Sequence, residues 1–286
     1  MKKTTELILA AAGGTAARRI IDDMSHLMVS RYTIRLKKLP ADFDGLRIVH
    51  LSDLHNKKYG RDDRQLYNAI INEKPDLVVM TGDMISHRAE NMEDFIRMTE
   101  KLCQKTAVAY VNGNHEMSDM SEEDFAAMTE RFEKAGALCL DNSFTTMYKG
   151  KGTDRINIGG LCYTAEFYKG VRQHKFSWNK FNLADMIKFC GEKPSDDFTI
   201  LLAHNPLDFD VHAQWGADLS FGGHIHGGFI RLPIVKGLVS PELTLFPKYK
   251  EGVYKKDSSC LVVSRGLGRI RFFNPPELVT VILRKK

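Results

Sequence analysis

Five short segments of the sequence carry side chains of the kinds that bind divalent metal ions, and each follows an apolar run typical of a β-strand. They are Ser52-Asp53-Leu54-His55, Thr81-Gly82-Asp83, Asn112-Gly113-Asn114-His115-Glu116, Ala203-His204-Asn205-Pro206 and Gly222-Gly223-His224-Ile225-His226-Gly227-Gly228. Carboxylate, amide-oxygen and imidazole ligands together suit first-row divalent ions such as Mn²⁺, Fe and Zn²⁺. The segments supply two Asp, one Asn and four or five His, which is too many ligands for one tetrahedral site, so the sequence predicts two metal ions.

The spacing inside these motifs has a structural reason. Asp53 and His55 are two residues apart, as are His224 and His226, and in extended backbone such pairs point the same way and can close on one ion. The neighbouring glycines permit tight turns and close backbone approach. A single motif of this kind occurs often by chance, and an isolated histidine at a strand end is commonly a hydrogen-bonded core or surface residue. Five motifs in series favour a metal site.

The elements that must position these motifs alternate between strands and helices. Strands are predicted over residues 32–36, 46–51, 77–80, 107–111, 156–158, 199–202, 219–221, 260–264 and 278–283, and helices over 61–73, 93–105 and 122–135. The first two strands are expected to form a hairpin. Strand-helix-strand alternation indicates right-handed crossovers and a largely parallel sheet, in which ligands bind at the carboxyl ends of the strands. The motifs stand at those ends.

Composition agrees with a folded protein. The chain has 286 residues, 43% of them apolar and 27% charged, which excludes a disordered or fibrous protein. The net charge of +5 is a mild bias toward anionic partners and too small for a nucleic-acid footprint, so specific nucleic-acid binding is not expected. Five widely separated cysteines indicate reduced core thiols. No apolar run approaches the roughly 20 residues that span a bilayer.

The motif order D-x-H, G-D, G-N-H-E, H and G-H-x-H resembles the calcineurin-like metallophosphoesterase superfamily over residues 46 to about 284. A second set is similar to the bacterial YkuE/YaeI-type branch of that superfamily: Ile230-Arg231-Leu232-Pro233, Leu245-Phe246-Pro247-Lys248-Tyr249, Gly252-Val253-Tyr254, Ser264-Arg265-Gly266-Leu267-Gly268 and Pro275-Pro276-Glu277. The resemblance implies an α/β fold, a four-layer α/β/β/α sandwich of two mixed sheets, with a dinuclear site at one end. We expect residues 31–286 to form this single domain.

The resemblance also implies which residues bind each metal ion. One metal ion would be bound by Asp53, His55 and His226, the other by Asn114, His204 and His224, and Asp83 would bridge both. Mn²⁺ is the favoured ion, with Fe, Zn²⁺ or a mixed pair as alternatives. A metal-bridging hydroxide would attack phosphorus in line.

His115 has a separate expected role. Its side chain diverges from that of its neighbour Asn114, so it cannot be a ligand if Asn114 is one. By resemblance it would stabilise the transition state or protonate the leaving oxygen, oriented by Glu116 or Asp53.

The expected substrate is a phosphodiester or phosphomonoester of a small molecule or lipid-linked metabolite. Candidate phosphate contacts are Arg265, Arg172 and Lys248, although these cations and the aromatic residues near them could instead anchor loops. Ile225 and Phe229 replace the Thr and Gln usual in the branch, which leaves the ligands intact and makes the rim more apolar. A non-catalytic metal-binding scaffold for protein interaction and, less favoured, a nuclease are the alternative functions.

Residues 1–30 are predicted to be an amphipathic helical appendage. Ile20, Ile21, Met24, Leu27 and Met28 form its apolar stripe. The stripe could pack on the protein itself or on a second subunit, contact a membrane interface, or belong to a cleaved signal peptide. We therefore expect a cytoplasmic protein that can be peripheral to the membrane, with export and the oligomeric state left open.

Overall fold

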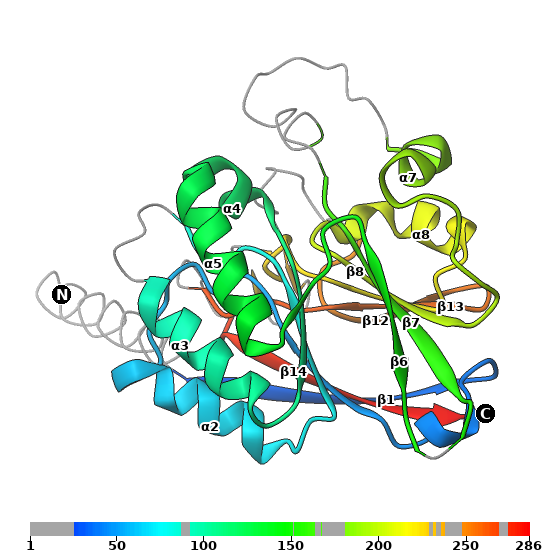
Figure 1. Ribbon diagram of the computed structural model, residues 1–286, viewed down its shortest axis with the longest axis horizontal. Helices are drawn as coiled ribbons and strands as arrows, with labels where there is room; N and C mark the ends of the chain where they lie inside the picture. The colour runs from blue at the N-terminus through cyan, green and yellow to red at the C-terminus, as the bar shows by residue number, and fades with distance from the viewer. Residues whose placement is uncertain are drawn as a thin grey trace, which may run out of the picture.

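Two six-stranded mixed sheets lie at the centre of the computed structural model, which describes residues 26–86, 92–150, 152–163, 167, 181–228, 231–232, 236–237, 248–268 and 274–286 (Figure 1). The first sheet has the order β1 (Met28–Leu36), β14 (Glu277–Lys285), β2 (Arg47–Leu51), β3 (Leu77–Thr81), β4 (Ala107–Val111) and β5 (Leu138–Cys139). The second has the order β12 (Gly252–Lys256), β13 (Ser259–Val263), β9 (Leu219–Gly222), β8 (Phe198–Ala203), β7 (Arg155–Leu161) and β6 (Phe144–Tyr148). A small ribbon pairs β10 (Arg231–Leu232) with β11 (Lys236–Gly237).

Helices cover the outer face of each sheet. The first sheet packs against α2 (Arg64–Asn72), α3 (Met92–Cys103) and α5 (Glu122–Ala135), and the second against α7 (Leu183–Cys190) and α8 (Phe209–Trp215). A short helix, α4 (Asn114–Asp119), follows β4, and single 3₁₀ turns lie at η1 (Ala41–Phe43), η2 (Arg61–Asp63) and η5 (Pro206–Asp208). The four-layer α/β/β/α fold predicted from the sequence is confirmed.

The main core lies between the two sheets. Along β3, Leu77 and Val79 belong to this inter-sheet core, whereas Val78 and Met80 pack among the helices. The alternation is the period-two pattern of a strand buried on both faces. On the opposing sheet, Ile200 of β8 and Phe221 of β9 join the same core. Because both sheets share it, their relative position is fixed at the ends of their strands.

The predicted hairpin between residues 32–36 and 46–51 is wrong. Strand β1 pairs in parallel with the carboxyl-terminal strand β14, which pairs antiparallel with β2 and separates the two. The connection between β1 and β2 buries Leu39 and Phe43 in the inter-sheet core, so it packs inward instead of reversing the chain tightly.

The described structure begins just before β1. Strand β1 starts at Met28, whose N–H donates to the Pro276 carbonyl (2.9 Å), so the last three residues of the predicted appendage belong to the first sheet. Residues 1–25, with most of the predicted amphipathic helix, lie outside the described residues. Within the described part of the chain, every helix is too short or too polar to cross a bilayer. All five cysteines are free, Cys190 and Cys260 are buried, and the other three are partly buried.

Strand β14 should be essential to the fold because it joins β1 to the rest of the first sheet. Leu283 is fully buried in the inter-sheet core opposite Ile34, so Leu283→Ala should lower the free energy of unfolding by about 2–5 kcal/mol in urea denaturation. Lys285→Ala, an exposed change two residues along the same strand, should stay within about 0.5 kcal/mol. Equal effects of the two changes would contradict the placement of β14.

Candidate metal centre

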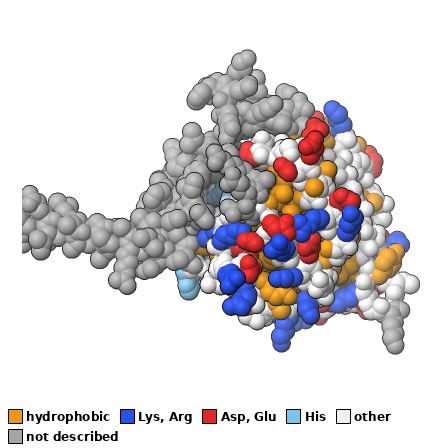
Figure 2. All heavy atoms as spheres, turned by 60° about the vertical axis from the view of Figure 1, so that its left-hand side comes forward, with side chains coloured by type: hydrophobic (Ala, Val, Ile, Leu, Met, Phe, Trp, Pro, Cys, Tyr) orange, Lys and Arg blue, Asp and Glu red, His pale blue; other side chains and the backbone are white. Residues whose placement is uncertain are grey.

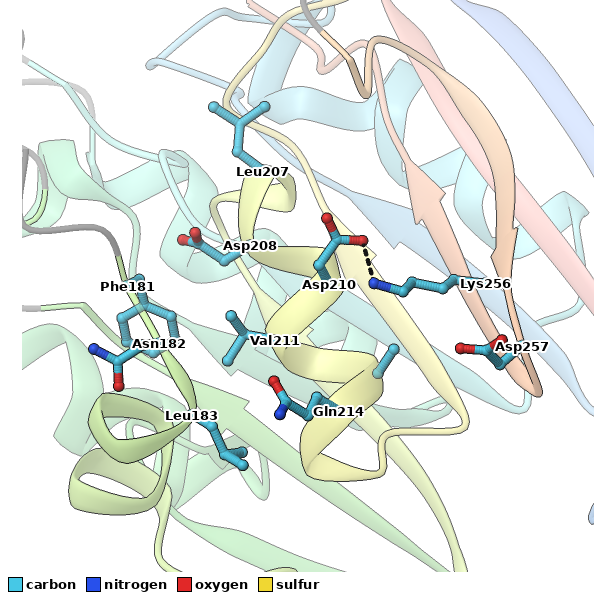
Figure 3. A pocket seen from close by; sticks show the side chains of 11 residues that line it. Phe181, Asn182, Leu183, Leu207, Asp208, Asp210, Val211, Gln214, Lys256 and Asp257 are labelled. Carbon is cyan, nitrogen blue, oxygen red and sulfur yellow. Dashed lines mark hydrogen bonds and ion pairs between the residues drawn. The ribbon is translucent and has the colours of Figure 1, made fainter.

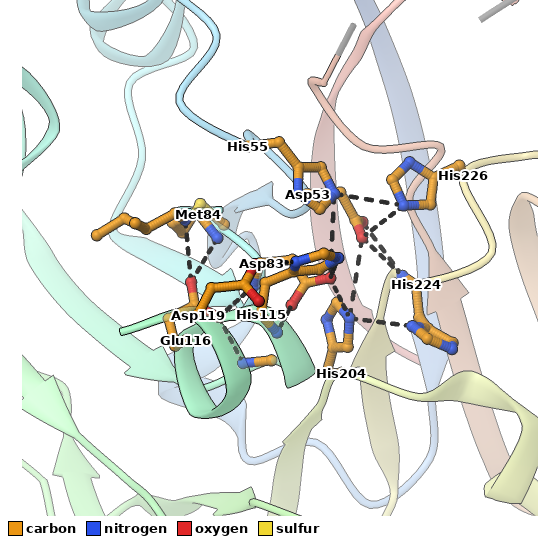
Figure 4. Close-up of polar contacts among 12 residues, drawn as sticks. Asp53, His55, Asp83, Met84, His115, Glu116, Asp119, His204, His224 and His226 are labelled. Atoms are coloured by element: carbon orange, nitrogen blue, oxygen red, sulfur yellow. Dashed lines mark hydrogen bonds and ion pairs between the residues drawn. The ribbon is translucent and has the colours of Figure 1, made fainter. Parts of the chain in front are cut away.

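The five motifs converge at one end of the sandwich (Figure 4). Strands β2, β3 and β4 run in parallel in the first sheet, as do β8 and β9 in the second, and each motif follows the carboxyl end of its strand. The ligand-type side chains of the two sheets therefore meet at the seam between them. The predicted ligand-type side chains therefore lie close together, as expected for residues at the carboxyl ends of parallel strands.

Three overlapping groups of side chains could each hold a cation, and the third of them joins His55 and Asp83 to His115. In the first, made by Asp53, His55 and His226, the His226 Nε2 lies 3.4 Å from both Asp53 Oδ1 and His55 Nε2. In the second, made by Asp83, His204 and His224, the His204 Nε2 lies 3.1 Å from Asp83 Oδ2 and 3.2 Å from His224 Nδ1. Asp83 Oδ2 is also 3.9 Å from His55 Nε2, so this carboxylate stands between the groups.

The donor atoms fit a metal ion. The Nδ1 of His204 lies 2.6 Å from the Thr81 carbonyl and donates to it, so in a neutral ring the Nε2 lone pair would face the Asp83 carboxylate. Two acceptors at this distance need a proton or a cation between them. Burial opposes protonation, yet the Asp83 and Asp53 carboxylates raise the pKa of His204 to about 10. Among the described residues, the buried Oδ1 of Asn114 has no hydrogen-bond partner, as expected for an amide oxygen that binds a cation.

Five of the candidate ligands have strained backbone conformations. Asp53, His55, Asp83, His224 and His226 all have φ between 49° and 63°, in the left-handed region. The expectation that the two-residue spacings lie in extended backbone is therefore wrong, and sharp turns after the strands bring the ligands together. Each such residue costs of order 1–3 kcal/mol, which the surrounding structure must offset.

Two glycines allow the close approach on which the site depends. A Cβ at Gly223 would lie 1.8 Å from Ser52 Oγ, across the seam between the sheets. A Cβ at Gly113 would lie 2.1 Å from Asp83 Oδ1. Any other residue at these positions would push the turn away from the candidate ligands.

His115 stands at the start of α4 beside the ligand groups. Its Nε2 lies 3.9 Å from Asp83 Oδ2, and its Nδ1 lies 2.6 Å from the Oδ2 of Asp119. The expectation that Glu116 or Asp53 orients His115 is wrong, because the Nδ1 of His115 faces the Asp119 carboxylate. The sequence signal was the four-residue spacing on a helix, which places the two side chains on one face.

Glu116 instead holds the turn that carries Asp83. Its buried carboxylate accepts hydrogen bonds from the backbone N–H groups of Asp83 (2.8 Å), Met84 (2.6 Å), Ile85 (3.1 Å) and Gly113 (3.0 Å). Burial, followed by the nearby Asp83 carboxylate, raises the pKa of Glu116 to about 7. Glu116 thus ties the end of β3 to the start of α4.

A family description for calcineurin-like phosphoesterases matches residues 46–228, which include every ligand-type residue of the site. The chain belongs to the calcineurin-like phosphoesterase family. It is 27% identical to the uncharacterized metallophosphoesterase YkuE of Bacillus subtilis, over 96% of this chain and 92% of YkuE. It is also 27% identical to the UDP-2,3-diacylglucosamine pyrophosphatase LpxG of Chlamydia muridarum, over 88% of each chain. A solved dimetal phosphatase from Danio rerio aligns with a TM-score of 0.43 and 13% identity, over 78% of this chain and 88% of that one.

The structure describes two of the three predicted phosphate contacts, and both of them pair with carboxylates. Arg265 is buried, and its Nε lies 3.2 Å from Glu277 and 3.6 Å from Glu251. Lys248 pairs with Asp210 (2.9 Å), a residue that lines a separate hollow of about 530 Å³ at α7 and α8 (Figure 3). Arg172 and Phe229 lie outside the described residues, and Ile225 is buried.

Because the family implies divalent ions, metal removal should destabilise the protein. A ligand that binds only the folded state at 100 times its dissociation constant adds about 2.7 kcal/mol to the free energy of unfolding. We expect a chelator to lower the Tm and added Mn²⁺ to restore it, measured by differential scanning fluorimetry. Asp83→Asn should weaken the response, whereas the exposed Asp196→Asn, before β8 and far from its carboxyl end, should keep it. A wild-type Tm indifferent to Mn²⁺ would contradict the metal centre.

Proposed function

We propose that the chain is a dinuclear metal-dependent phosphoesterase that hydrolyses a phosphodiester or phosphomonoester of a small molecule or lipid-linked metabolite. The observation that carries the proposal is the pair of ligand groups with Asp83 between them, each drawing side chains from turns at the carboxyl ends of strands. A single closed structural site would not use so many ligands. Family membership supports the phosphoesterase chemistry.

In this proposal Asp53, His55 and His226 would hold one ion, Asn114, His204 and His224 would hold the other, and Asp83 would serve both. When bound, the two ions would lower the pKa of an attacking water and neutralise charge on the phosphoryl oxygens. Mn²⁺ is the first candidate, with Fe, Zn²⁺ or a mixed pair as alternatives. The buried carboxylates would offset the charge of the ions, and the turns that carry these carboxylates would keep the geometry rigid.

His115 would act on the other side of the phosphorus. In-line attack puts the leaving oxygen opposite the entering water. The Nε2 of His115 faces the centre while its Nδ1 is bound to Asp119, so Nε2 can deliver a proton to that leaving oxygen. The substrate would therefore lie with its leaving group toward α4.

A lipid-linked substrate is favoured by one comparison. The relative LpxG is named for a pyrophosphatase acting on UDP-2,3-diacylglucosamine, a nucleotide sugar that carries acyl chains.

The two alternative functions have less support. A non-catalytic scaffold would not need the His115–Asp119 pair beside a full ligand set. A nuclease would be expected to present a continuous basic surface, whereas basic and acidic side chains are interspersed on the face seen in Figure 2. Arg131 of α5, for example, pairs with Glu93 and Glu100 of α3.

Metal analysis with an activity assay tests the proposal. We expect about two metal ions per chain and Mn²⁺-dependent hydrolysis of bis-p-nitrophenyl phosphate, p-nitrophenyl phosphate or both, with the ratio of rates reporting diester or monoester preference. Asp83→Asn should reduce turnover by roughly 10²–10³-fold, because the ions contribute several kcal/mol to the transition state. Asp196→Asn is the matched control. Wild-type protein that binds metal yet hydrolyses neither ester would favour the scaffold, and metal-free, inactive protein would contradict the proposal.

The role of the amino-terminal segment is tested by deletion. A chain starting at residue 26 keeps β1 and all seven candidate ligands, so its turnover of a soluble aryl ester should stay within about twofold of the full chain. If the segment makes the proposed peripheral membrane contact, only the full chain should sediment with anionic lipid vesicles. A large loss of soluble turnover would mean that residues 1–25 complete the site or a dimer.

A further inference from the structure

We infer that Asn274 is a positioning residue for one of the two metal ions: its side chain holds the turn that carries His226 and so completes the group formed by Asp53, His55 and His226. The inference rests on the proposed function and adds to it a residue outside the ligand motifs. The family match ends at residue 228, and Asn274 lies beyond it.

The Asn274 amide binds the backbone of the His226 turn. Its Nδ2 donates to the carbonyl oxygens of His226 (2.6 Å) and Gly228 (3.1 Å). Asn274 is fully buried, which strengthens these hydrogen bonds and makes their loss costly. The turn needs such support because residues 226–228 all have positive φ, a strained conformation at His226.

Arg265, an expected phosphate contact, supports the same turn from another side. A Cβ at Gly227 would lie 2.7 Å from the Arg265 Cγ, so the aliphatic part of this side chain packs directly on the turn. Its charged end faces Glu277 and Glu251, which keep it in place. The His226 turn is therefore held by two residues of the carboxyl-terminal part of the chain.

The turn at Leu267 and Gly268 supports the other two ligands of this group. The N–H of Leu267 donates to the carbonyl oxygens of Ser52 (3.0 Å) and Asp53 (3.1 Å). A Cβ at Gly268 would lie 3.0 Å from both the Asp53 carbonyl oxygen and the His55 Cδ2, so this turn fits closely against both ligands. All three ligands of the group thus rest on residues 265–274.

The group formed by Asp83, His204 and His224 is held from a different direction. The Thr81 carbonyl accepts from the His204 ring, and the Glu116 carboxylate accepts from backbone N–H groups of the turn that carries Asp83. Because each group has its own support, removal of the Asn274 amide should weaken the binding of one ion much more than that of the other.

Titration of the metal-free full chain with Mn²⁺, followed by isothermal titration calorimetry, tests the inference. We expect two Mn²⁺ ions per wild-type chain. In Asn274→Ala the dissociation constant of one ion should rise by about tenfold or more, the effect of one lost buried hydrogen bond, and that of the other by less than about threefold. Should Asn274→Ala fail to fold, Asn274→Ser, which keeps a hydroxyl donor, is titrated in its place.

Asn157→Ala is the matched control. Asn157 is 4% exposed, its Nδ2 donates to Ser195 Oγ (2.9 Å), and it lies near the start of β7, at the opposite end of the strand from the metal centre. Both changes remove a buried amide, so a general loss of stability would appear in both variants. Asn157→Ala should leave both dissociation constants within about threefold of the wild type.

Two further measurements separate positioning from stability. In a His226→Ala background, Asn274→Ala should change Mn²⁺ affinity by less than about threefold, because its effect passes through His226. In the metal-free chain, hydrogen exchange followed by mass spectrometry should be faster over residues 224–228 of Asn274→Ala than of the wild type, and unchanged there in Asn157→Ala.

Equal weakening of both ions, an effect of the same size in Asn157→Ala, or unchanged exchange over residues 224–228 would each overturn the inference. Wild-type protein that binds two Mn²⁺ ions yet cleaves neither p-nitrophenyl ester would overturn the proposed function alone, and the titration would still decide the role of Asn274. Wild-type protein that binds no Mn²⁺ would overturn both.

Discussion

The structure depends on holding lone-pair-bearing and negatively charged atoms together at the seam between two sheets. Within each candidate group the ligand atoms lie within 4.8 Å of one another, a separation at which they repel or compete for protons unless a cation joins them. Neither sheet could oppose that repulsion alone, because Asp53 and Asp83 come from the first and His204 and His224 from the second. The shared apolar core behind the seam keeps the sheets in register.

Hydrogen bonds across the seam orient the candidate ligands of the two sheets toward one another. The N–H of His224 donates to the Asp53 carboxylate (3.1 Å to Oδ1), and the His204 ring donates to the Thr81 carbonyl, so each sheet orients a ligand of the other. These contacts also explain why left-handed backbone persists at five of the candidate ligands. Glu116 adds a third anchor by accepting four backbone N–H groups around the Asp83 turn. The backbone strain lies at the candidate ligands, and the apolar core together with these hydrogen bonds offsets it.

The sequence could predict most of this arrangement because its signals are local. Apolar runs followed by His, Asp and Asn identify strands and the ends at which ligands gather. Their alternation with helices indicates a largely parallel sheet, whereas the four layers come from the resemblance to the calcineurin-like family. The neighbour of β1 could not be found in this way: strand β14 lies some 240 residues away, and nothing local distinguishes it from β2. The left-handed turns and the Asp119 partner also escaped, since both depend on how the chain bends after the strand ends.

The two sheets contribute different side chains to the site. The first sheet carries Asp53, Asp83, His55 and the His115–Asp119 pair, and the second carries His204, His224 and His226. Arg265 is buried against Glu277 and Glu251. A rigid scaffold with its reactive groups at strand ends can keep one reaction while the surrounding surface changes. For that reason, relatives that share these ligands need not share a substrate.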